Sequence, residues 1–164
     1  MRAMVLMGCC LALLTGCGGP GPEESATTAA DMREEVIETV RTVSQGLRER
    51  GVDVSVASGS YGACGLQTRQ LEYAAGLRTT VDSGPISEQF AAAREVIEAL
   101  GLPMVESDAP DFVSTDGGED DLRVSANEAR AEPGTLVVEV VRDCEDMDAD
   151  VADEKLNEDV ETIQ

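Results

Sequence analysis

The side chains of this sequence that could do chemistry are its five cysteines and its many carboxylates. The chain has 164 residues, with 33 Asp and Glu, 12 Lys and Arg, and no histidine. Because an imidazole is missing, a Ser-His-Asp triad, a Cys-His pair and a histidine metal site are excluded. The net charge of −21 opposes binding to nucleic acid, which needs basic contacts to phosphate. We therefore expect no enzyme, no catalytic residue, no metal site, no cofactor and no nucleic-acid partner.

Cys17 stands at the end of a segment with the pattern of an export signal. Arg2 precedes an apolar stretch over residues 3–14, which is too short to span about 30 Å of hydrocarbon as a helix. The sequence Leu-Thr-Gly-Cys over residues 14–17 resembles the bacterial lipobox, in which the cysteine receives a diacylglyceryl group before the leader is removed. An ordinary signal peptide, or an uncleaved anchor that contains a cysteine, is the alternative.

The lipobox resemblance has consequences for where the protein lies. It implies that residues 1–16 are a signal peptide, that Cys17 carries the lipid, and that the membrane is a partner of the chain. Two acyl chains, at about 0.8 kcal/mol per buried CH₂, anchor a protein stably, whereas one chain is marginal. The expected location is the extracytoplasmic face of a bacterial cell membrane. The small body and the excess of Arg over Lys also resemble the small LppA-like lipoproteins of actinobacteria.

Cys64 and Cys144 are the two cysteines left for an exported domain. Cys9 and Cys10 would leave with the leader, and Cys17 would take the lipid. Because disulfides persist outside the cytoplasm, we expect Cys64 and Cys144 to form one. The bridge would close a loop of about 80 residues and stabilise the fold by about 4 kcal/mol in the chain-entropy model. It requires Cα atoms within about 7 Å of each other, and two separate buried thiols are the alternative.

Residues 59–65 form a glycine-rich stretch, Gly-Ser-Tyr-Gly-Ala-Cys-Gly. The stretch lacks the Lys-Ser/Thr ending of a phosphate-binding P-loop and the spacing of a dinucleotide fingerprint. Ser60 does not lie in a Gly-x-Ser-x-Gly nucleophile elbow. We expect a bulge or a tight turn between two strands, with Tyr61 packed beside it.

The C-terminal residues 145–164 are strongly acidic, and Lys155 is their only cation. Asp146, Asp148 and Asp150 alternate as oxygen ligands do at the start of a calcium loop. The resemblance ends there, because valine and asparagine replace the glycine and the glutamate that such a loop needs. We expect an acidic, disordered tail with weak cation attraction.

The body between the two ends is predicted to be a single domain over residues 32–144. Residues 17–31 are expected to be the lipidated cysteine and a flexible tether, since they are rich in Gly, Pro, Ser and Thr. Apolar residues at steps of three and four predict a helix from Met32 to Gly51. Alternating apolar residues predict strands at 52–56 and 71–81.

A second predicted helix, from Ile86 to Gly101, repeats the offsets of the first and also ends in glycine. Short strands are expected after it, at residues 104–105, 122–126 and 136–141. Residues 108–121 are expected to be an exposed loop. We predict an α+β fold of two α-β-β units with disordered termini, in which an antiparallel sheet carries two helices packed on one face. Chance similarity of two amphipathic helices is the alternative explanation of the repeat.

The predicted function is that of a lipid-anchored extracytoplasmic lipoprotein of the cell envelope. We expect a non-enzymatic module, present as a monomer, that binds a ligand or an envelope partner. Two alternatives stay open: an exported hydrolase that uses carboxylates alone, and an acidic surface protein that binds cations. A buried pair of Asp or Glu in a sizeable cleft would favour the hydrolase, whereas carboxylates scattered over a convex surface would count against it.

Overall fold

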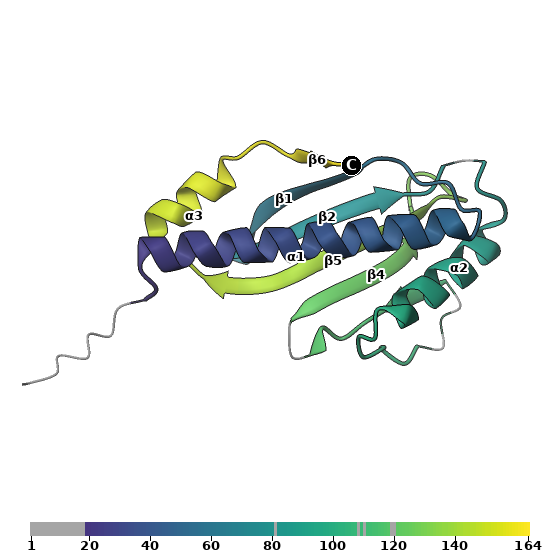
Figure 1. Ribbon diagram of the computed structural model, residues 1–164, viewed down its shortest axis with the longest axis horizontal. Coiled ribbons are helices and arrows are strands. Elements are labelled where there is room, and N and C mark those ends of the chain that lie inside the picture. Colours follow the sequence, from purple (N-terminus) through teal and green to yellow (C-terminus); the bar gives the residue numbers. More distant parts are fainter. Residues whose placement is uncertain (1–18, 81, 108, 110, 119–120) are drawn as a thin grey trace, which may run out of the picture.

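The computed structural model describes residues 19–164, except residues 81, 108, 110, 119 and 120. Cys17 and the predicted leader therefore lie outside the described residues. Within the described part of the chain, three helices and six strands follow one another (Figure 1). These elements are α1 (Pro22–Glu49), β1 (Ala57–Cys64), β2 (Gln67–Arg78), α2 (Ile86–Ala99), β3 (Phe112–Ser114), β4 (Leu122–Glu128), β5 (Leu136–Asp146), α3 (Ala149–Leu156) and β6 (Glu161–Ile163).

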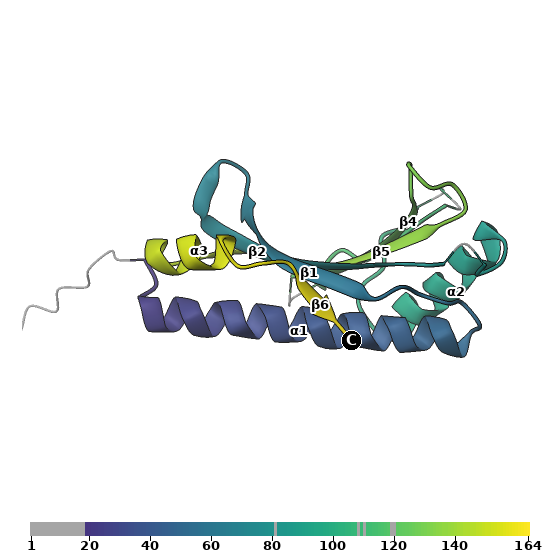
Figure 2. The same cartoon turned by 90° about the horizontal axis from the view of Figure 1, so that it is seen from above.

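A six-stranded sheet is the centre of the fold. Its strand order is β3-β4-β5-β2-β1-β6, and every neighbouring pair is antiparallel. The helix α1 packs along β2 and β5, while α2 contacts β3, β4, β5 and α1. Figure 2 shows α1 and α2 on the same side of the sheet. The predicted α+β fold, with two α-β-β units and two helices on one face, is confirmed.

The core lies between the helices and the inner face of the sheet. The apolar residues that predicted the first helix are all buried there, since Met32, Val36, Val40, Val43 and Leu47 are each at most 2% exposed. Alternate residues of β2 point to the same side, as the period of two requires, and are equally buried. These residues of β2 are Leu71, Tyr73, Ala75 and Leu77. The apolar residues of α1 lie on one face of the helix, and those of β2 on one face of the strand. These two faces pack against each other, and burial of their apolar surface drives the packing.

The two α-β-β units share local details that support the predicted repeat. A glycine with positive φ follows α1 and α2, and Gly51 and Gly101 both have a φ of 78°, which glycine adopts without steric cost. Three residues beyond each glycine, Val54 and Met104 each form an isolated antiparallel bridge. The two units therefore match over the segment that leads from the end of the helix to the isolated bridge.

The tether predicted over residues 17–31 is wrong for its described part, because α1 begins at Pro22. Proline is favoured at the first position of a helix, where its missing N–H costs nothing. Ser25 and Ala29, in the first turns of α1, are fully buried. The Ser25 Oγ accepts a hydrogen bond of 2.8 Å from the backbone N–H of Asp148. The helix begins earlier than its apolar pattern because the C-terminal segment packs against its first turns.

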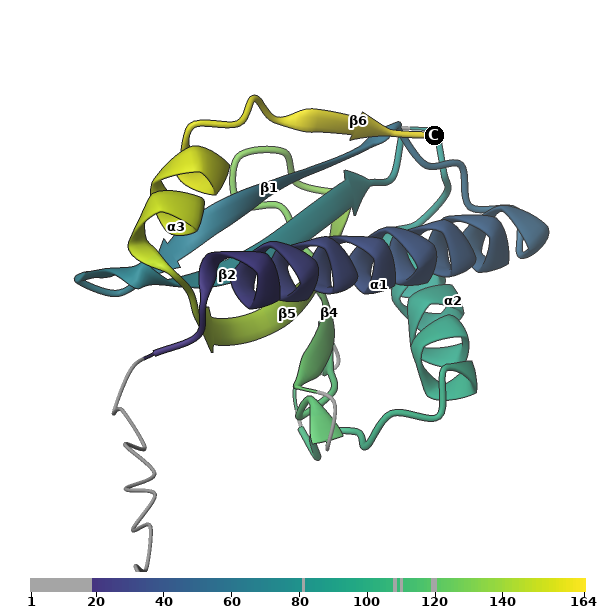
Figure 3. The same ribbon diagram turned by 60° about the vertical axis from the view of Figure 1, so that its left-hand side comes forward.

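The prediction of a disordered acidic tail over residues 145–164 is also wrong. The strand β5 runs into this segment, α3 follows it, and β6 pairs with β1 at the edge of the sheet. Figure 3 shows α3 beside the first turns of α1, and β6 along β1. The segment folds because a few apolar residues among its acids enter the core: Met147, Ala152 and Ile163 are at most 5% exposed.

Two predicted boundaries in the body differ from the structure. The strand β1 begins at Ala57, and within the predicted strand over residues 52–56 only Val54 forms a bridge. The predicted loop over residues 108–121 contains β3. Both differences arise because pairing of the main chain with a neighbouring strand defines a strand, and side-chain alternation does not report that pairing.

The glycine-rich stretch over residues 59–65 is mostly strand. It forms β1 up to Cys64, and the turn to β2 begins at Gly65, which has a φ of 65°. The strand needs glycine at Gly59, because an added Cβ would lie 2.5 Å from the hydroxyl oxygen of Tyr73. One of these glycines thus makes room for a buried side chain, and another makes the turn.

Candidate functional site

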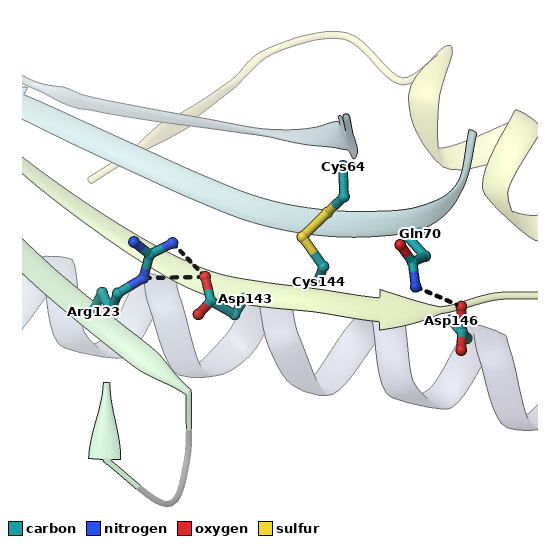
Figure 4. The surroundings of a disulfide bond; sticks show 6 residues. All are labelled: Cys64, Gln70, Arg123, Asp143, Cys144 and Asp146. Carbon is teal, nitrogen blue, oxygen red and sulfur yellow. Dashed lines mark hydrogen bonds and ion pairs between the residues drawn. A yellow bond between two sulfur atoms is a disulfide. The ribbon is translucent and has the colours of Figure 1, made fainter. Parts of the chain in front are cut away.

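The predicted disulfide between Cys64 and Cys144 is present, and it crosses an intervening strand. The Cα atoms of the two cysteines lie 6.1 Å apart, within the range of a disulfide. Cys64 ends β1 and Cys144 lies near the end of β5, while β2 runs between these two strands in the sheet. Figure 4 shows the bond passing over the ribbon of β2. The disulfide ties the first α-β-β unit to the last strand of the second unit.

Irregular strand pairing beside the disulfide explains how it reaches across β2. Strands two apart in a flat sheet are separated by about 9.5 Å, which is more than a disulfide spans. The pairing of β2 with β5 shifts register between Leu71 and Tyr73, so that Asp143 and Cys144 on β5 lie opposite a single residue. The pairing of β1 with β2 also shifts, at Cys64. Such bulges bend strands and increase their twist, and Figure 2 shows the β1–β2 hairpin curling away from α1.

Glu72 lies beside the disulfide and completes the one group of three thiol or carboxylate ligands found among the described residues. The ligand atoms of Cys64, Glu72 and Cys144 lie within 4.8 Å of one another. Both sulfurs are held in the disulfide, so neither is the thiolate that a metal ion requires. The group is therefore a covalent link with a carboxylate beside it.

The alternating aspartates at Asp146, Asp148 and Asp150 begin a helix instead of an ion-binding loop. Asp148 is the N-cap of α3, and its Oδ1 accepts a hydrogen bond of 3.0 Å from the backbone N–H of Asp150. Asp150 lies in the first turn, where an acid interacts favourably with the helix dipole. The side-chain amide of Gln70 donates a bond of 3.0 Å to Asp146. The junction of β5 and α3 thus explains the spacing that resembled a calcium loop.

The buried polar side chains of the described residues belong to serine, threonine and glutamine, and none is a carboxylate. They are Ser25, Ser44, Thr79, Ser83, Gln89, Thr115 and Thr135. A hydrolase that uses two carboxylates would need them paired in a cleft, with a raised pKa on the one that acts as the acid. The described part of the chain holds no such buried pair.

A polar cluster joins β6 to α1 and β2. Glu161 on β6 accepts a hydrogen bond of 2.7 Å from Nε of Arg33 on α1, and it also accepts one from the hydroxyl of Tyr73 on β2. The ring of Tyr61 packs edge to face against that of Tyr73, with centroids 4.8 Å apart. The hydroxyl of Tyr61 donates to the carbonyl of Ala29 at 2.6 Å. The cluster fastens the C-terminal strand to the body.

Burial and hydrogen bonding shift the pKa values in this cluster. Burial opposes ionisation of Glu161, but the hydrogen bonds from Arg33 and Tyr73 outweigh it and lower the pKa of Glu161. Burial raises the pKa of Tyr61 to about 12, and burial together with the bond to Glu161 raises the pKa of Tyr73. At neutral pH the tyrosines are neutral and the carboxylate is charged. The cluster is therefore structural, because none of its groups titrates near neutral pH, where a general acid or base would have to exchange a proton. We call the cluster of Arg33, Tyr61, Tyr73 and Glu161 the latch.

An open groove of about 770 Å³ lies at the far end of α1, beside the edge of the sheet. Residues from the second half of α1, from the segment before β1 and from the end of β6 line it. Val40 and Ile163 in the lining are 1% and 5% exposed, whereas Val56 is 62% exposed. The volume lies within the range of roughly 300–1,000 Å³ that is typical of small-molecule sites.

Two arginines line the same groove. Arg41 and Arg48 are seven residues apart, about two helical turns, and so lie on one face of α1. The Nε of Arg41 donates a hydrogen bond of 2.9 Å to the backbone oxygen of Gln164. Among the described residues, neither arginine pairs with an Asp or Glu side chain, whereas five other arginines do. Neither arginine was among the expected site residues, although two arginines that lie two turns apart beside the apolar stripe of a helix are a pattern visible in the sequence.

No protein-family model, no curated protein and no solved structure matches this chain. Within the residues that the structure describes, no helix combines the length and the apolar character needed to cross a membrane. Lipidation of Cys17 falls outside those residues and stays a prediction.

Proposed function

We propose that this chain is a lipoprotein held by lipid on Cys17 at the extracytoplasmic face of a bacterial cell membrane. Its folded body binds a ligand or an envelope partner without catalysis. The observation that carries the proposal is the separation of 6.1 Å between the Cα atoms of Cys64 and Cys144, because a disulfide persists in an oxidising compartment. The lipobox-like residues 14–17 support the anchor.

The position of the groove supports a binding role away from the membrane. Four residues separate Cys17 from Pro22, where α1 begins. At about 1.5 Å per residue, the 28 residues of α1 span about 42 Å, and Ser44 in the groove lies about 33 Å from the start of the helix. A lipid on Cys17 would hold the first turns of α1 near the bilayer and present the groove away from it.

The charge of the chain supports attachment by lipid alone. Removal of residues 1–16 takes away Arg2 and no acid, which leaves 11 cations against 33 acids and a net charge of −22. Anionic headgroups repel such a domain. The helix α3 packs beside the start of α1, and the first turn of α3 carries an acid at Asp150. The folded body would therefore stand on its anchor and would not lie flat on the membrane.

Metabolic labelling with an alkyne analogue of palmitate tests the anchor. In a bacterial host, the full-length chain should take up the label and sediment with membranes, whereas Cys17→Ala should do neither. Cys10→Ala is the matched control, because it removes a cysteine from the same leader but leaves the lipobox intact, and it should label like the unchanged chain. Label that persists in Cys17→Ala, or sedimentation of the unchanged chain without label, would overturn the proposal.

A further inference from the structure

We infer that the groove beside α1 binds a single-chain amphiphile with an anionic head group, either a carboxylate or a phosphate. The inference deepens the proposed binding role and rests on it for the claim that the body binds a ligand, but it does not depend on lipid at Cys17. An apolar floor, an exposed apolar wall and two arginines meet in this one groove, and their juxtaposition carries the inference.

The floor of the groove suits a hydrocarbon chain. Val40 of α1, Ala57 of β1 and Ile163 of β6 form this floor and are at most 5% exposed. Pairing of Ala57 with Ile163 in the sheet, and packing of α1 against it, fix these side chains in the core. Because the floor is formed before a ligand arrives, binding requires little additional ordering of the protein.

Val56 gives the groove an apolar wall that the fold itself does not bury. It lies in the segment before β1, lines the groove and is 62% exposed. A hydrocarbon chain that lies along the floor would cover Val56 and remove its surface from water. Val160 is exposed to a similar extent, 66%, but does not line the groove. The two valines therefore form a matched pair for a test.

Arg41 and Arg48 set the preference for the head group. The net charge of −21 makes most of the surface repel anions, yet these two arginines line an apolar groove. A guanidinium group forms paired hydrogen bonds with a carboxylate or a phosphate. Ser44 lies between them on α1 and adds a hydroxyl donor to the lining. Glu49, the one Asp or Glu side chain of the lining, accepts a hydrogen bond of 2.8 Å from the amide of Gln45, and Gln164 already accepts one of 2.9 Å from Nε of Arg41 through its main-chain oxygen.

Calorimetric titration of the full-length chain with Cys17→Ser, which removes the lipid acceptor, tests the inference. Laurate and dodecyl phosphate, each below its micelle concentration, should bind at one site. Dodecyltrimethylammonium has the same tail and the opposite charge. The acidic surface attracts it as a whole, but Arg48→Gln removes a cation and so should not weaken its binding. Butyrate keeps the carboxylate but loses most of the tail, and it should give no heat. The affinities of lysophosphatidylglycerol and laurate are then compared. Tighter binding of lysophosphatidylglycerol indicates a ligand derived from membrane lipid, and tighter binding of laurate indicates a free fatty acid.

Single substitutions locate the binding site in the groove. Arg48→Gln should weaken laurate binding about fivefold, the upper range for an exposed ion pair, and Val56→Ser should weaken it about threefold. Arg130→Gln and Val160→Ser remove the same side chains from exposed positions outside the groove and should leave the affinity unchanged. All four residues are exposed, so each variant should keep the circular dichroism spectrum of the parent chain. The apolar leader is the same in every variant and cannot produce a difference among them.

The possible results separate the groove from the anchor. Equal weakening of laurate and dodecyltrimethylammonium binding by Arg48→Gln, or equal weakening by the groove variants and their controls, would overturn the inference. If the unchanged chain takes up lipid on Cys17 while no amphiphile binds, the inference about the groove fails and the anchor stands. If laurate binds in the groove while Cys17 stays unmodified, the groove has its ligand and the proposed membrane attachment fails.

Discussion

Cys64 and Cys144 are joined across β2, with Cα atoms 6.1 Å apart, although their strands are not neighbours in the sheet. The bond fastens the curled end of the β1–β2 hairpin to the bulge on β5 where Asp143 and Cys144 face a single residue. Figure 4 shows α1 behind the sheet and the disulfide in front of it. The disulfide therefore joins β1 and β5 on the face of the sheet that α1 and α2 do not cover.

Loss of this disulfide should lower the free energy of unfolding by about 4 kcal/mol, because the bond closes a loop of 80 residues. Cys64→Ser, Cys144→Ser and the double variant should lose about the same amount, since each change breaks the same bond. Urea denaturation followed by circular dichroism measures the loss. If the double variant lost the sum of the two single losses, the two cysteines would be acting independently, contrary to the structure.

Gly59 should not tolerate a side chain, whereas Gly62 on the same strand should. An added Cβ at Gly59 would lie 2.5 Å from the hydroxyl oxygen of Tyr73, but at Gly62 its nearest neighbour would be 3.4 Å away on the flexible side chain of Glu72. Gly59→Ala should therefore lower the free energy of unfolding by about 1–3 kcal/mol, and Gly62→Ala by much less. In the background of Tyr73→Phe, which removes the clashing oxygen, Gly59→Ala should cost less than it does in the unchanged chain. Equal losses for the two alanine variants in urea denaturation would contradict this packing.

Met147 should contribute strongly to stability, although it lies in the acidic segment predicted to be disordered. Its side chain is fully buried, so Met147→Ala should lower the free energy of unfolding by about 2–5 kcal/mol. Val160→Ala, at a position that is 66% exposed in the same segment, should change it by less than about 0.5 kcal/mol. Thermal and urea denaturation of both variants compare the two values. A negligible effect of Met147→Ala would mean that the segment does not pack as described.

Glu161 should make stability depend on pH in the acid range. Burial raises the pKa of Glu161, but hydrogen bonds from Arg33 and Tyr73 outweigh it, so the pKa is lower in the folded chain than in the unfolded one. Such a carboxyl stabilises the fold above its unfolded pKa of about 4.3, and this contribution disappears as the pH falls through the folded pKa. Glu161→Gln should be less stable than the unchanged chain at neutral pH, and the difference should shrink as the pH falls below about 4.

Urea denaturation at a series of pH values measures that difference. Glu154→Gln is the control, because the side chain of Glu154 is 73% exposed and takes no part in the latch. Its difference from the unchanged chain should be small at every pH. A deficit of Glu161→Gln that stays constant down to pH 3 would show that the charge of Glu161 does not contribute to the latch.

The faces of the helices and of β2 could be predicted from the sequence, because burial repeats with the period of each element. The first turns of α1 and the C-terminal segment could not, since their order depends on contacts between distant residues. Ser25 meets Asp148, and Arg33 meets Glu161 across 128 positions of the chain. Neither contact leaves a local pattern in the sequence, and composition alone favoured disorder at both places.

Of the candidate sites, the disulfide could be predicted from the sequence, whereas the groove could not. Cys64 and Cys144 could be paired by elimination, because no other cysteine remains for an exported domain. The groove could not be found, because Val40, Val56 and Ile163 reach it from three separate segments. The pairing of β6 with β1 brings the end of the chain beside α1.

Mass spectrometry of the N-terminal peptide, from protein isolated out of bacterial membranes, decides whether lipid holds this chain at its location. The mature chain should begin at Cys17 and carry the added mass of a diacylglyceryl group. An unmodified Cys17, a different first residue or a leader that is still attached would contradict attachment by lipid and leave the fold, the disulfide and the groove as they are.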